Sequence, residues 1–314
     1  MVIRRRKKPL VLQKLEATMP RLSSRFPKLS EIQQDIAQRY KGYIGEQKVD
    51  YHLEILAPQF TIIQDVCLKN QGRKFQTDSI IITNHAIFCI ESKNYDGTIT
   101  FNTILKQFTR NDGKIETGYR YPITQAETNA FHLQNWLQAH HFHNIPIHYL
   151  IAISEPSTII QVIGDRESIA RVVAHGEHVP QKIIHANDKL KGNAGISRRQ
   201  IGNTILRECI EYDFDILGTY GIKANNIMTG VICQSCNRLA MKRIHSNWIC
   251  TKCNYKSKNA HIRAIKEYLL LIKPYITNQE CMHFLRISSR SVATRLLKSS
   301  GLTYDPQNRR WMIK

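Results

Sequence analysis

Three charged side chains stand at the ends of two apolar stretches of the chain. Asp78 precedes residues 79–83, and Glu91 and Lys93 follow residues 86–90. Both stretches are rich in β-branched residues, which is typical of strands covered on both faces. Because side chains alternate along a strand, Glu91 and Lys93 share one face, and a neighbouring strand can bring Asp78 to them.

Two carboxylates a few ångströms apart repel each other unless a cation lies between them. Carboxylates together with water suit magnesium. A lysine beside such an ion can orient or deprotonate a water, or stabilise charge that develops on a phosphate. Asp78, Glu91 and Lys93 therefore predict metal-assisted hydrolysis of a phosphodiester bond. A structural ion pair at the strand ends is the alternative interpretation.

A long helix is expected over residues 31–56, and its apolar stripe includes Glu46. An acid in an apolar stripe is costly unless it is paired. Glu46 is therefore expected to meet Lys93, a metal ion or a water held by either, and Gly42 and Gly45 would let the helix approach the sheet closely. If the stripe is rotated slightly, Glu46 lies at its edge in solvent instead.

A second helix is expected to begin at Pro122, a residue suited to the first helical turn. Gln125 would then face back toward the end of the sheet, close to a helix N-terminus where a phosphate can bind. A solvated glutamine is equally compatible with the sequence.

Several of these residues belong to short motifs, which are Gly45-Glu46, Gln76-Thr77-Asp78, Glu91-Ser92-Lys93-Asn94, Gly97, and Tyr121-Pro122 with Gln125. With these motifs the chain resembles the nuclease-related domain (NERD) family, a branch of the PD-(D/E)XK nuclease-like fold, over roughly residues 40 to 155. Thr77 and Tyr121 depart from the family pattern, which has an aliphatic residue and an asparagine there. Neither change removes a ligand.

The resemblance implies a metal-dependent endonuclease that acts on DNA. It places Asp78 and Glu91 as ligands of Mg²⁺ or Mn²⁺, Lys93 as the residue that positions the attacking water, and Glu46 and Gln125 in support. The whole chain resembles long family members that append a zinc ribbon and a small C-terminal domain. A catalytically inactive or regulatory nucleic-acid-binding protein is the alternative, because an intact set of residues does not measure activity.

The chain is strongly basic, with 45 Lys and Arg against 25 Asp and Glu, a net charge of +20 and a pI near 9.7. Such an imbalance indicates a polyanionic partner, and we expect nucleic acid rather than an anionic membrane surface. No apolar run is long enough to span a bilayer, so a cytoplasmic protein is expected. Arg4 to Lys8 would form an arm that contacts phosphates or a solvated tail.

Four of the eight cysteines form two pairs, Cys233-x2-Cys236 and Cys250-x2-Cys253, separated by thirteen residues. This spacing is typical of two knuckles that hold one tetrahedral structural Zn²⁺. A redox pair would ordinarily stand alone at the start of a helix. The remaining cysteines are expected to be reduced core residues, and His245 and His261 are not expected to be ligands. Those cysteines are Cys67, Cys89, Cys209 and Cys281.

Residues 277–300 predict two short helices joined by a turn. Thr277 and Glu280 form a capping box for the first helix, and Ser288 is expected to cap the second. The pattern is typical of a helix-turn-helix, or of a protein-contact module of the same shape. The expected nucleic-acid contacts are Arg290, Thr294, Arg295 and Lys298 on the second helix, and Arg309 and Arg310 in a wing over residues 303–313.

The expected division of the chain has five segments, namely a basic N-terminal arm (1–30), a NERD nuclease-like core (31–165), a mostly helical connecting region (166–229), a zinc ribbon (230–258) and a helix-turn-helix or winged-helix-like domain (259–314). Strand, helix and strand follow one another in the core, with a hairpin over residues 105–115 and a central strand over residues 147–153. This order predicts an α/β sheet with helices on both faces. The family resemblance further implies that this fold is a restriction-endonuclease-like mixed sheet flanked by helices.

Overall fold

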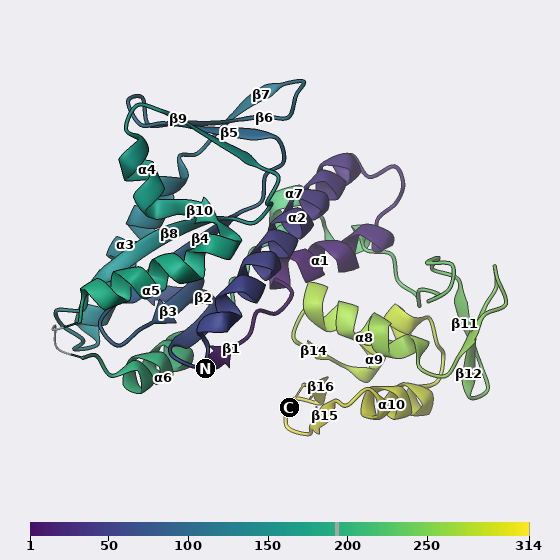
Figure 1. Ribbon diagram of the computed structural model, residues 1–314. Coiled ribbons are helices and arrows are strands. Elements are labelled where there is room, and N and C mark those ends of the chain that lie inside the picture. The colour runs from purple at the N-terminus through teal and green to yellow at the C-terminus, as the bar shows by residue number, and fades with distance from the viewer. Residues whose placement is uncertain (192–194, 314) are drawn as a thin grey trace. The chain divides into compact units, whose positions relative to one another are not determined.

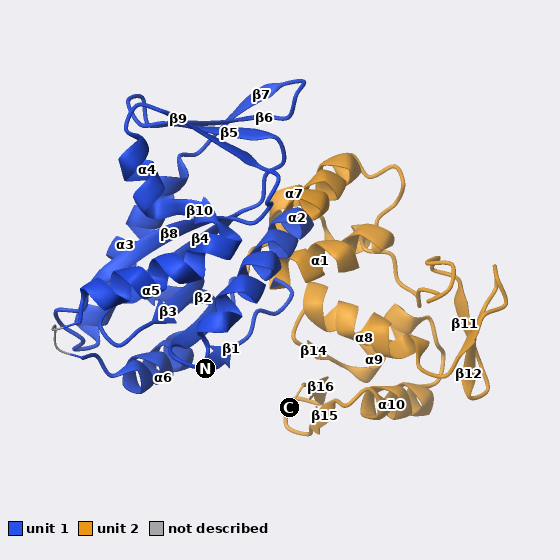
Figure 2. Cartoon of the chain, in the orientation of Figure 1, with its two compact units in different colours: residues 1–9, 39–212 blue, residues 10–38, 213–314 orange. Residues whose placement is uncertain are grey.

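The computed structural model describes residues 1–191 and 195–313. The chain forms two compact units (Figure 2), of which unit 1 comprises residues 1–9 and 39–212 and unit 2 comprises residues 10–38 and 213–314. The boundary falls within the long helix α2 (Leu29–Leu53), where an uninterrupted helix is expected from the sequence.

Unit 1 is built on a mixed six-stranded sheet, labelled in Figure 1. β2, β3 and β4 pair in antiparallel fashion, whereas β1 lies parallel to β2, and β4, β8 and β10 are parallel to one another. The strand order is β1 (Val2–Arg4), β2 (Thr61–Asn70), β3 (Arg73–Ile82), β4 (Ile87–Lys93), β8 (Ile147–Ile153) and β10 (Val173–His175).

Helices cover both faces of this sheet, because its strands carry apolar residues on both faces. Ile80 and Ile82 face a core shared with α3 (Pro122–Ala139) and α6 (Arg198–Glu208). Ile81 faces the opposite core, which α2 and α5 (Val179–Lys189) complete. The expected α/β arrangement is confirmed, and β8 lies inside the sheet as expected.

A second, four-stranded sheet belongs to the same unit. Its order is β7 (Glu116–Tyr119), β6 (Gln107–Asn111), β5 (Thr98–Asn102) and β9 (Ile159–Ile163), with α4 (Arg166–Val172) following β9. The expected turn at Asn111-Asp112-Gly113 is present, and the side chains of Asn111 and Asp112 accept backbone hydrogen bonds within it. The strands lie later than expected, because Leu105 belongs to the connection between β5 and β6.

Unit 2 joins residues 10–38 to the C-terminal part of the chain. One hydrophobic core includes Leu15 from α1 (Leu10–Thr18), Trp248 from β12, Ala264 from α8 and Leu297 from α10. Its elements beyond residue 213 are α7 (Ile216–Tyr220), β11 (Met241–Ile244), β12 (Asn247–Cys250), β13 (Lys256–Ser257), α8 (Ala260–Leu271), β14 (Tyr275–Ile276), α9 (Asn278–Leu285), α10 (Arg290–Ser299), β15 (Thr303–Asp305) and β16 (Arg310–Met312). Short 3₁₀ turns lie at Met19–Arg21, Glu54–Leu56, Gly176–His178 and Ala224–Asn226.

The expected helix-turn-helix elements are present as α9 and α10. Thr277 and Glu280 form the capping box at the start of α9. Ser289, not Ser288, caps α10, and its hydroxyl accepts a bond from the N–H of Val292. The helix therefore begins one residue later than the sequence suggested.

The expectation of an N-terminal arm is wrong for the first eighteen residues. β1 pairs with β2 in the main sheet, and the α1 residues Val11, Leu12 and Leu15 are buried. The basic run Arg4 to Lys8 suggested a solvent-exposed arm, although apolar residues that form a strand and a helix lie on either side of it. Among the described residues, no helix is both long and apolar enough to cross a bilayer.

The core of unit 2 contains a fully buried arginine. The Arg21 side chain has 0% exposure, and its Nη2 lies 2.6 Å from Glu267 Oε2. Its Nη1 donates to the carbonyl oxygens of Met228 at 2.9 Å and Gly230 at 3.2 Å. The guanidinium also lies 4.5 Å from the centre of the Phe284 ring. All three nitrogen atoms of the Arg21 guanidinium thus have hydrogen-bond acceptors.

We predict that Arg21→Ala destabilises unit 2 by about 3–5 kcal/mol, because the buried Glu267 carboxylate keeps only Arg263 and the carbonyls of Met228 and Gly230 lose their donor. Urea unfolding followed by the fluorescence of Trp248 and Trp311, in a Trp136→Phe background, measures this change. Arg25→Ala removes an exposed arginine of the same unit and serves as the control. Equal stabilities of the two variants would contradict the role given to Arg21.

Candidate active site and zinc centre

The pairing of β3 with β4 brings Asp78 to the stretch that holds Glu91 and Lys93. The antiparallel ladder ends at Ser79 opposite Ile90. Beyond it, the backbone N–H of Ser92 donates to Asp78 Oδ2 at 2.6 Å. This bond fixes the Asp78 carboxylate just beyond the last residue pair of the ladder. Glu91 and Lys93 flank Ser92 at this end of β4.

Glu91, Lys93 and Gln125 form a closed triangle of contacts. Lys93 Nζ lies 2.8 Å from Glu91 Oε1 and donates to Gln125 Oε1 at 3.2 Å. Gln125 Nε2 in turn donates to Glu91 Oε1 at 2.5 Å. Gln125 lies in the first turn of α3, so the helix start faces the sheet end as the sequence suggested. The amide holds both the acid and the amine in place.

Glu46 does not pair with Lys93; its partner is Arg6. Arg6 Nη1 lies 2.7 Å from Glu46 Oε2, and Arg6 Nε lies 2.7 Å from Asp50 Oδ2. Arg6 Nη2 donates to the backbone carbonyl of Asp78 at 2.6 Å. The guanidinium has only 3% exposure and ties α2 to the start of the candidate site.

Sequence reasoning missed both Arg6 and Asp50. Arg6 is hidden inside a run of basic residues that was interpreted as a tail, and 40 residues separate it from Glu46. Asp50 offered a usable signal, because it lies one helical turn after Glu46 on the same apolar stripe. A pair of acids on one stripe requires a cation, which Arg6 provides.

Gly45 allows α2 to lie close to the site, as expected. A Cβ atom on Gly45 would lie 2.5 Å from Asn94 Cβ and 2.9 Å from Ser154 Oγ. A side chain here would push the helix away from the end of β4. Gly42 has nothing within 4 Å of such an atom, so close packing does not explain that glycine.

The acids of the site resist ionisation. Burial and the charge of Asp78 raise the pKa of Glu91 to about 7 and the pKa of Glu46 to about 8. Burial also raises the pKa of Asp78, against the opposing effects of Arg6 and the Ser92 N–H. Burial lowers the pKa of Lys93, but Glu91 and Asp78 outweigh it, and the net shift is upward. Added positive charge would stabilise the ionised carboxylates.

The donor set fits a hard divalent cation. Asp78 and Glu91 offer carboxylate oxygens, the ligand type of Mg²⁺ and Mn²⁺, and Mg²⁺ keeps several waters when it binds to one or two carboxylates. Within the part of the chain that the structure describes, no three carboxylates lie close enough to enclose an ion. Among the described residues, four cysteines form the one group of at least three His, Cys, Asp or Glu side chains with that geometry.

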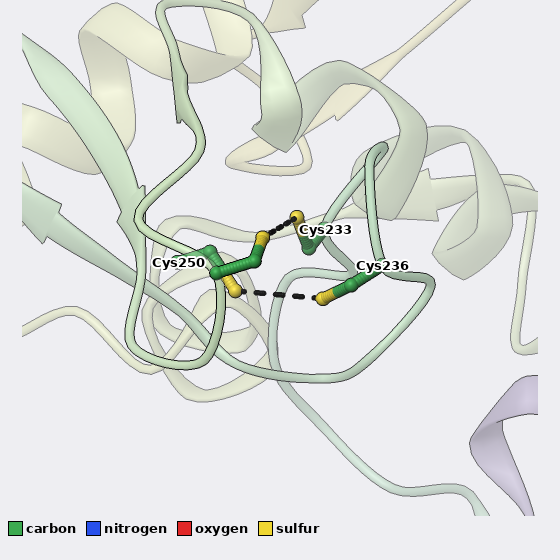
Figure 3. A group of neighbouring side chains, drawn as sticks. Cys233, Cys236 and Cys250 are labelled. Atoms are coloured by element: carbon green, nitrogen blue, oxygen red, sulfur yellow. Dashed lines mark hydrogen bonds between the residues drawn. The ribbon is translucent and has the colours of Figure 1, made fainter.

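Those cysteines are Cys233, Cys236, Cys250 and Cys253, whose sulfur atoms all lie within 4.8 Å of one another (Figure 3). Cys233 and Cys253 have their sulfurs 3.6 Å apart, as have Cys236 and Cys250. A disulfide bond requires about 2 Å, whereas zinc with four sulfurs at ~2.3 Å places them about 3.8 Å apart. The residues fit one tetrahedral Zn²⁺.

The two knuckles repeat the same backbone turn. Asn237 donates its N–H to the carbonyl of Cys233, and Asn254 donates to that of Cys250, both at 3.0 Å. Both asparagines adopt the left-handed conformation, with φ of 52° and 57°, which asparagine tolerates better than most residues. An asparagine directly after each Cys-x-x-Cys was therefore a sequence signal that the spacing argument did not use.

The Arg238 N–H points to the Cys236 sulfur, but burial and the other cysteine sulfurs outweigh it and raise the pKa of Cys236 to about 11. The surroundings of Cys250 instead favour its thiolate. Burial opposes ionisation of Cys250, but the N–H groups of Lys252 and Cys253 point to its sulfur, and its pKa falls to about 6. His261 is not a ligand: it is buried against Trp248, whose Nε1 lies 3.3 Å from His261 Nδ1. The other four cysteines are free thiols.

The nucleic-acid contacts expected on α10 lie on its exposed side, namely Arg290, Thr294, Arg295 and Lys298. Thr294 accepts a hydrogen bond from Asn278 and is thus partly engaged. In the wing, Arg309 is exposed. Arg310 pairs with Asp305 at 3.2 Å and lies over Tyr275, so it has a structural role as well.

We predict that Arg6→Leu destabilises unit 1 by about 3–5 kcal/mol, because Glu46 and Asp50 lose their shared cation. Arg5→Leu is the matched control: Arg5 is 67% exposed and pairs with Glu54 at the surface, a contact worth about 1 kcal/mol or less. Urea unfolding followed by Trp136, the one tryptophan in the sequence of unit 1, reports the difference. A loss confined to Arg5→Leu would refute the assignment.

We also predict that the protein purified under reducing conditions carries one equivalent of zinc. Cys233→Ser should abolish it and destabilise unit 2, because Cys233, Cys250 and Trp248 belong to the core of that unit. Metal analysis and Trp248 fluorescence provide the measurements, with Cys209→Ser as a thiol control outside the cluster. Protein that lacks zinc and is fully folded would disprove the zinc assignment.

Comparison with protein families found a match to the nuclease-related domain family (NERD) over residues 41–154. Searches of curated proteins and of solved structures found no match. The matched segment contains Glu46, Asp78, Glu91, Lys93 and Gln125, while Arg6 and the four zinc-site cysteines lie outside it. Residues 41–154 of this chain thus match the nuclease-related domain family, and the candidate site within them is completed by an arginine from the N-terminal strand region.

Proposed function

We propose that the protein is a metal-dependent nuclease that hydrolyses phosphodiester bonds, with DNA as its substrate. The observation that carries this proposal is the convergence of Asp78, Glu91, Lys93 and Gln125 at one end of the sheet, within a nuclease-related domain. A structural ion pair would need only Glu91 and Lys93. It would not explain why Asp78 brings a second, half-buried carboxylate to the same point.

Each residue has a role that its contacts support. Asp78 and Glu91 would hold Mg²⁺ or Mn²⁺, which supplies charge neutralisation at the phosphate when bound. Lys93 is held by Glu91 and Gln125 with its ammonium group at the sheet end, where it orients the attacking water and stabilises negative charge on phosphate oxygens. Water oxygen forms the new bond to phosphorus, one ester oxygen leaves, and the water proton passes to solvent or to the leaving group.

Glu46 acts from α2 as the third acid near the site. Burial, together with repulsion from Asp78, raises the pKa of Glu46. Arg6 offsets that repulsion and fixes the carboxylate. Glu46 would therefore support the site by holding a water near Asp78, with Arg6 fixing its carboxylate.

The free thiols suit a reducing compartment, and we propose that the protein acts in the cytoplasm. Charge is unevenly divided between the units, with 21 Lys and Arg against 8 Asp and Glu in unit 2, and 24 against 17 in unit 1. More than half of the net charge thus falls on the zinc-site unit. This asymmetry favours unit 2 as the nucleic-acid anchor, including in the alternative case of a catalytically inactive or regulatory binding protein.

The test is incubation of the purified protein with supercoiled DNA, single-stranded DNA and RNA, each with Mg²⁺, with Mn²⁺ and with chelator. We expect cleavage that requires metal and falls by about 10²-fold or more in Lys93→Ala. Lys114→Ala, at an exposed lysine in the β6–β7 turn, is the matched control and should cleave like the wild type.

Two outcomes count against the proposal in different ways. If the wild type cleaves none of the substrates with either metal, the nuclease assignment fails, and binding measured in chelator decides whether the alternative holds. If Lys93→Ala and the wild type cleave equally, the cleavage does not originate at Asp78, Glu91 and Lys93.

A further inference from the structure

A cleft of about 520 Å³ lies within unit 2, lined by the ribbon strand β11, the second zinc knuckle and the turn between α9 and α10. All four charged side chains that line it are cationic, and no carboxylate is among the described lining residues. These cations are Lys242, Arg243, Lys252 and Arg286. Thr251, Ser288 and Ser289 also line it.

Arg243 is the unusual member of this lining. Its Nε and Nη1 atoms are buried, and neither has a hydrogen-bond partner among the described residues. The guanidinium lies 5.5 Å from the centre of the Trp248 ring, which covers one face of it. A guanidinium stays charged in proteins, and buried donors without an acceptor are costly. Arg243, which lines the cleft, therefore has buried donors for which the described residues supply no acceptor.

The groups around Arg243 add positive charge and do not neutralise the charge of its guanidinium. Burial and the nearby charge of Arg295 both lower the pKa of Arg243. Arg295 lies on the exposed side of α10, and that ten-residue helix begins at the cleft with Ser289 as its cap. The positive end of a helix dipole favours an anion at such a point.

We propose that this cleft binds a backbone phosphate of nucleic acid, with Arg243 as the central contact and the exposed side of α10 beside it. The volume falls within the range of about 300–1,000 Å³ found for ligand sites, so a phosphate enters together with its sugar. Ile287, Val292 and Met241 supply an apolar wall for the sugar. This inference rests on the proposed nucleic-acid function, but it does not depend on catalysis.

The experiment measures binding of the full-length protein to a labelled DNA duplex and a labelled single strand by fluorescence anisotropy, in chelator so that no cleavage occurs. Arg243→Gln should weaken binding about tenfold and reduce the slope of log affinity against log salt by about 1, the contribution of one phosphate contact. Arg238→Gln, at an exposed arginine of the first zinc knuckle outside the cleft, should leave affinity and slope unchanged.

Zinc content and thermal unfolding show whether Arg243→Gln remains folded. If it does not, Lys242→Gln tests the same cleft from an exposed position and should give a smaller loss of affinity. Inorganic phosphate is added as a competitor and, separately, as a stabilising ligand, to distinguish nucleic acid from a free phosphate compound.

Wild-type affinity and slope in a folded Arg243→Gln would overturn the proposal, whether or not the protein is a nuclease. A wild type that binds no nucleic acid, yet is stabilised by inorganic phosphate in an Arg243-dependent way, would also overturn it, because the cleft would then serve a small phosphate-containing ligand. Conversely, absence of cleavage together with Arg243-dependent DNA binding would defeat the nuclease assignment and leave this inference standing.

Discussion

A single buried guanidinium, that of Arg6, holds the candidate active site together. It contacts Glu46 and Asp50 on α2 and the backbone carbonyl of Asp78 on β3. Without a cation at this point, α2 would bring two acids toward a strand end that already holds Asp78 and Glu91. Burial, and after it repulsion from Asp78, raises the pKa of Glu46 to about 8, and Arg6 opposes this shift. The packing of α2 against the sheet and the arrangement of the site thus both depend on the positive charge of Arg6.

This constraint explains why the nuclease-related segment depends on residues that precede it. The family match begins at residue 41, but β1 pairs with β2 and places Arg6 against α2. Asp50 Oδ1 also accepts a bond from Ser79 Oγ at 2.8 Å. Helix and strand are therefore joined both directly and through Arg6. The N-terminal residues belong to the site's framework, although their composition alone suggests a phosphate-binding tail.

The sequence predicted those features that depend on short spacing, and it missed those that depend on long-range contact. Alternation along β4 places Glu91 and Lys93 together, and the Cys-x-x-Cys pairs place four sulfurs together, because each spacing is set by local backbone geometry. Arg6 reaches Glu46 across 40 residues of sequence. No local pattern distinguishes Arg6 from its neighbour Arg5, whose side chain is 67% exposed.

Three arginines of this protein show how burial separates structural cations from those that serve a ligand. Arg6 meets carboxylates on α2, and Arg21 meets Glu267 and two carbonyl oxygens, so the fold itself satisfies both groups. Arg243 has buried donor atoms, an aromatic ring on one face and another arginine nearby, but no acceptor among the described residues. A fold that matches two buried guanidinium groups so fully has the means to match a third. The missing acceptor at Arg243 is therefore best supplied from outside the chain, and a phosphate has the charge, the oxygen geometry and the size for that place.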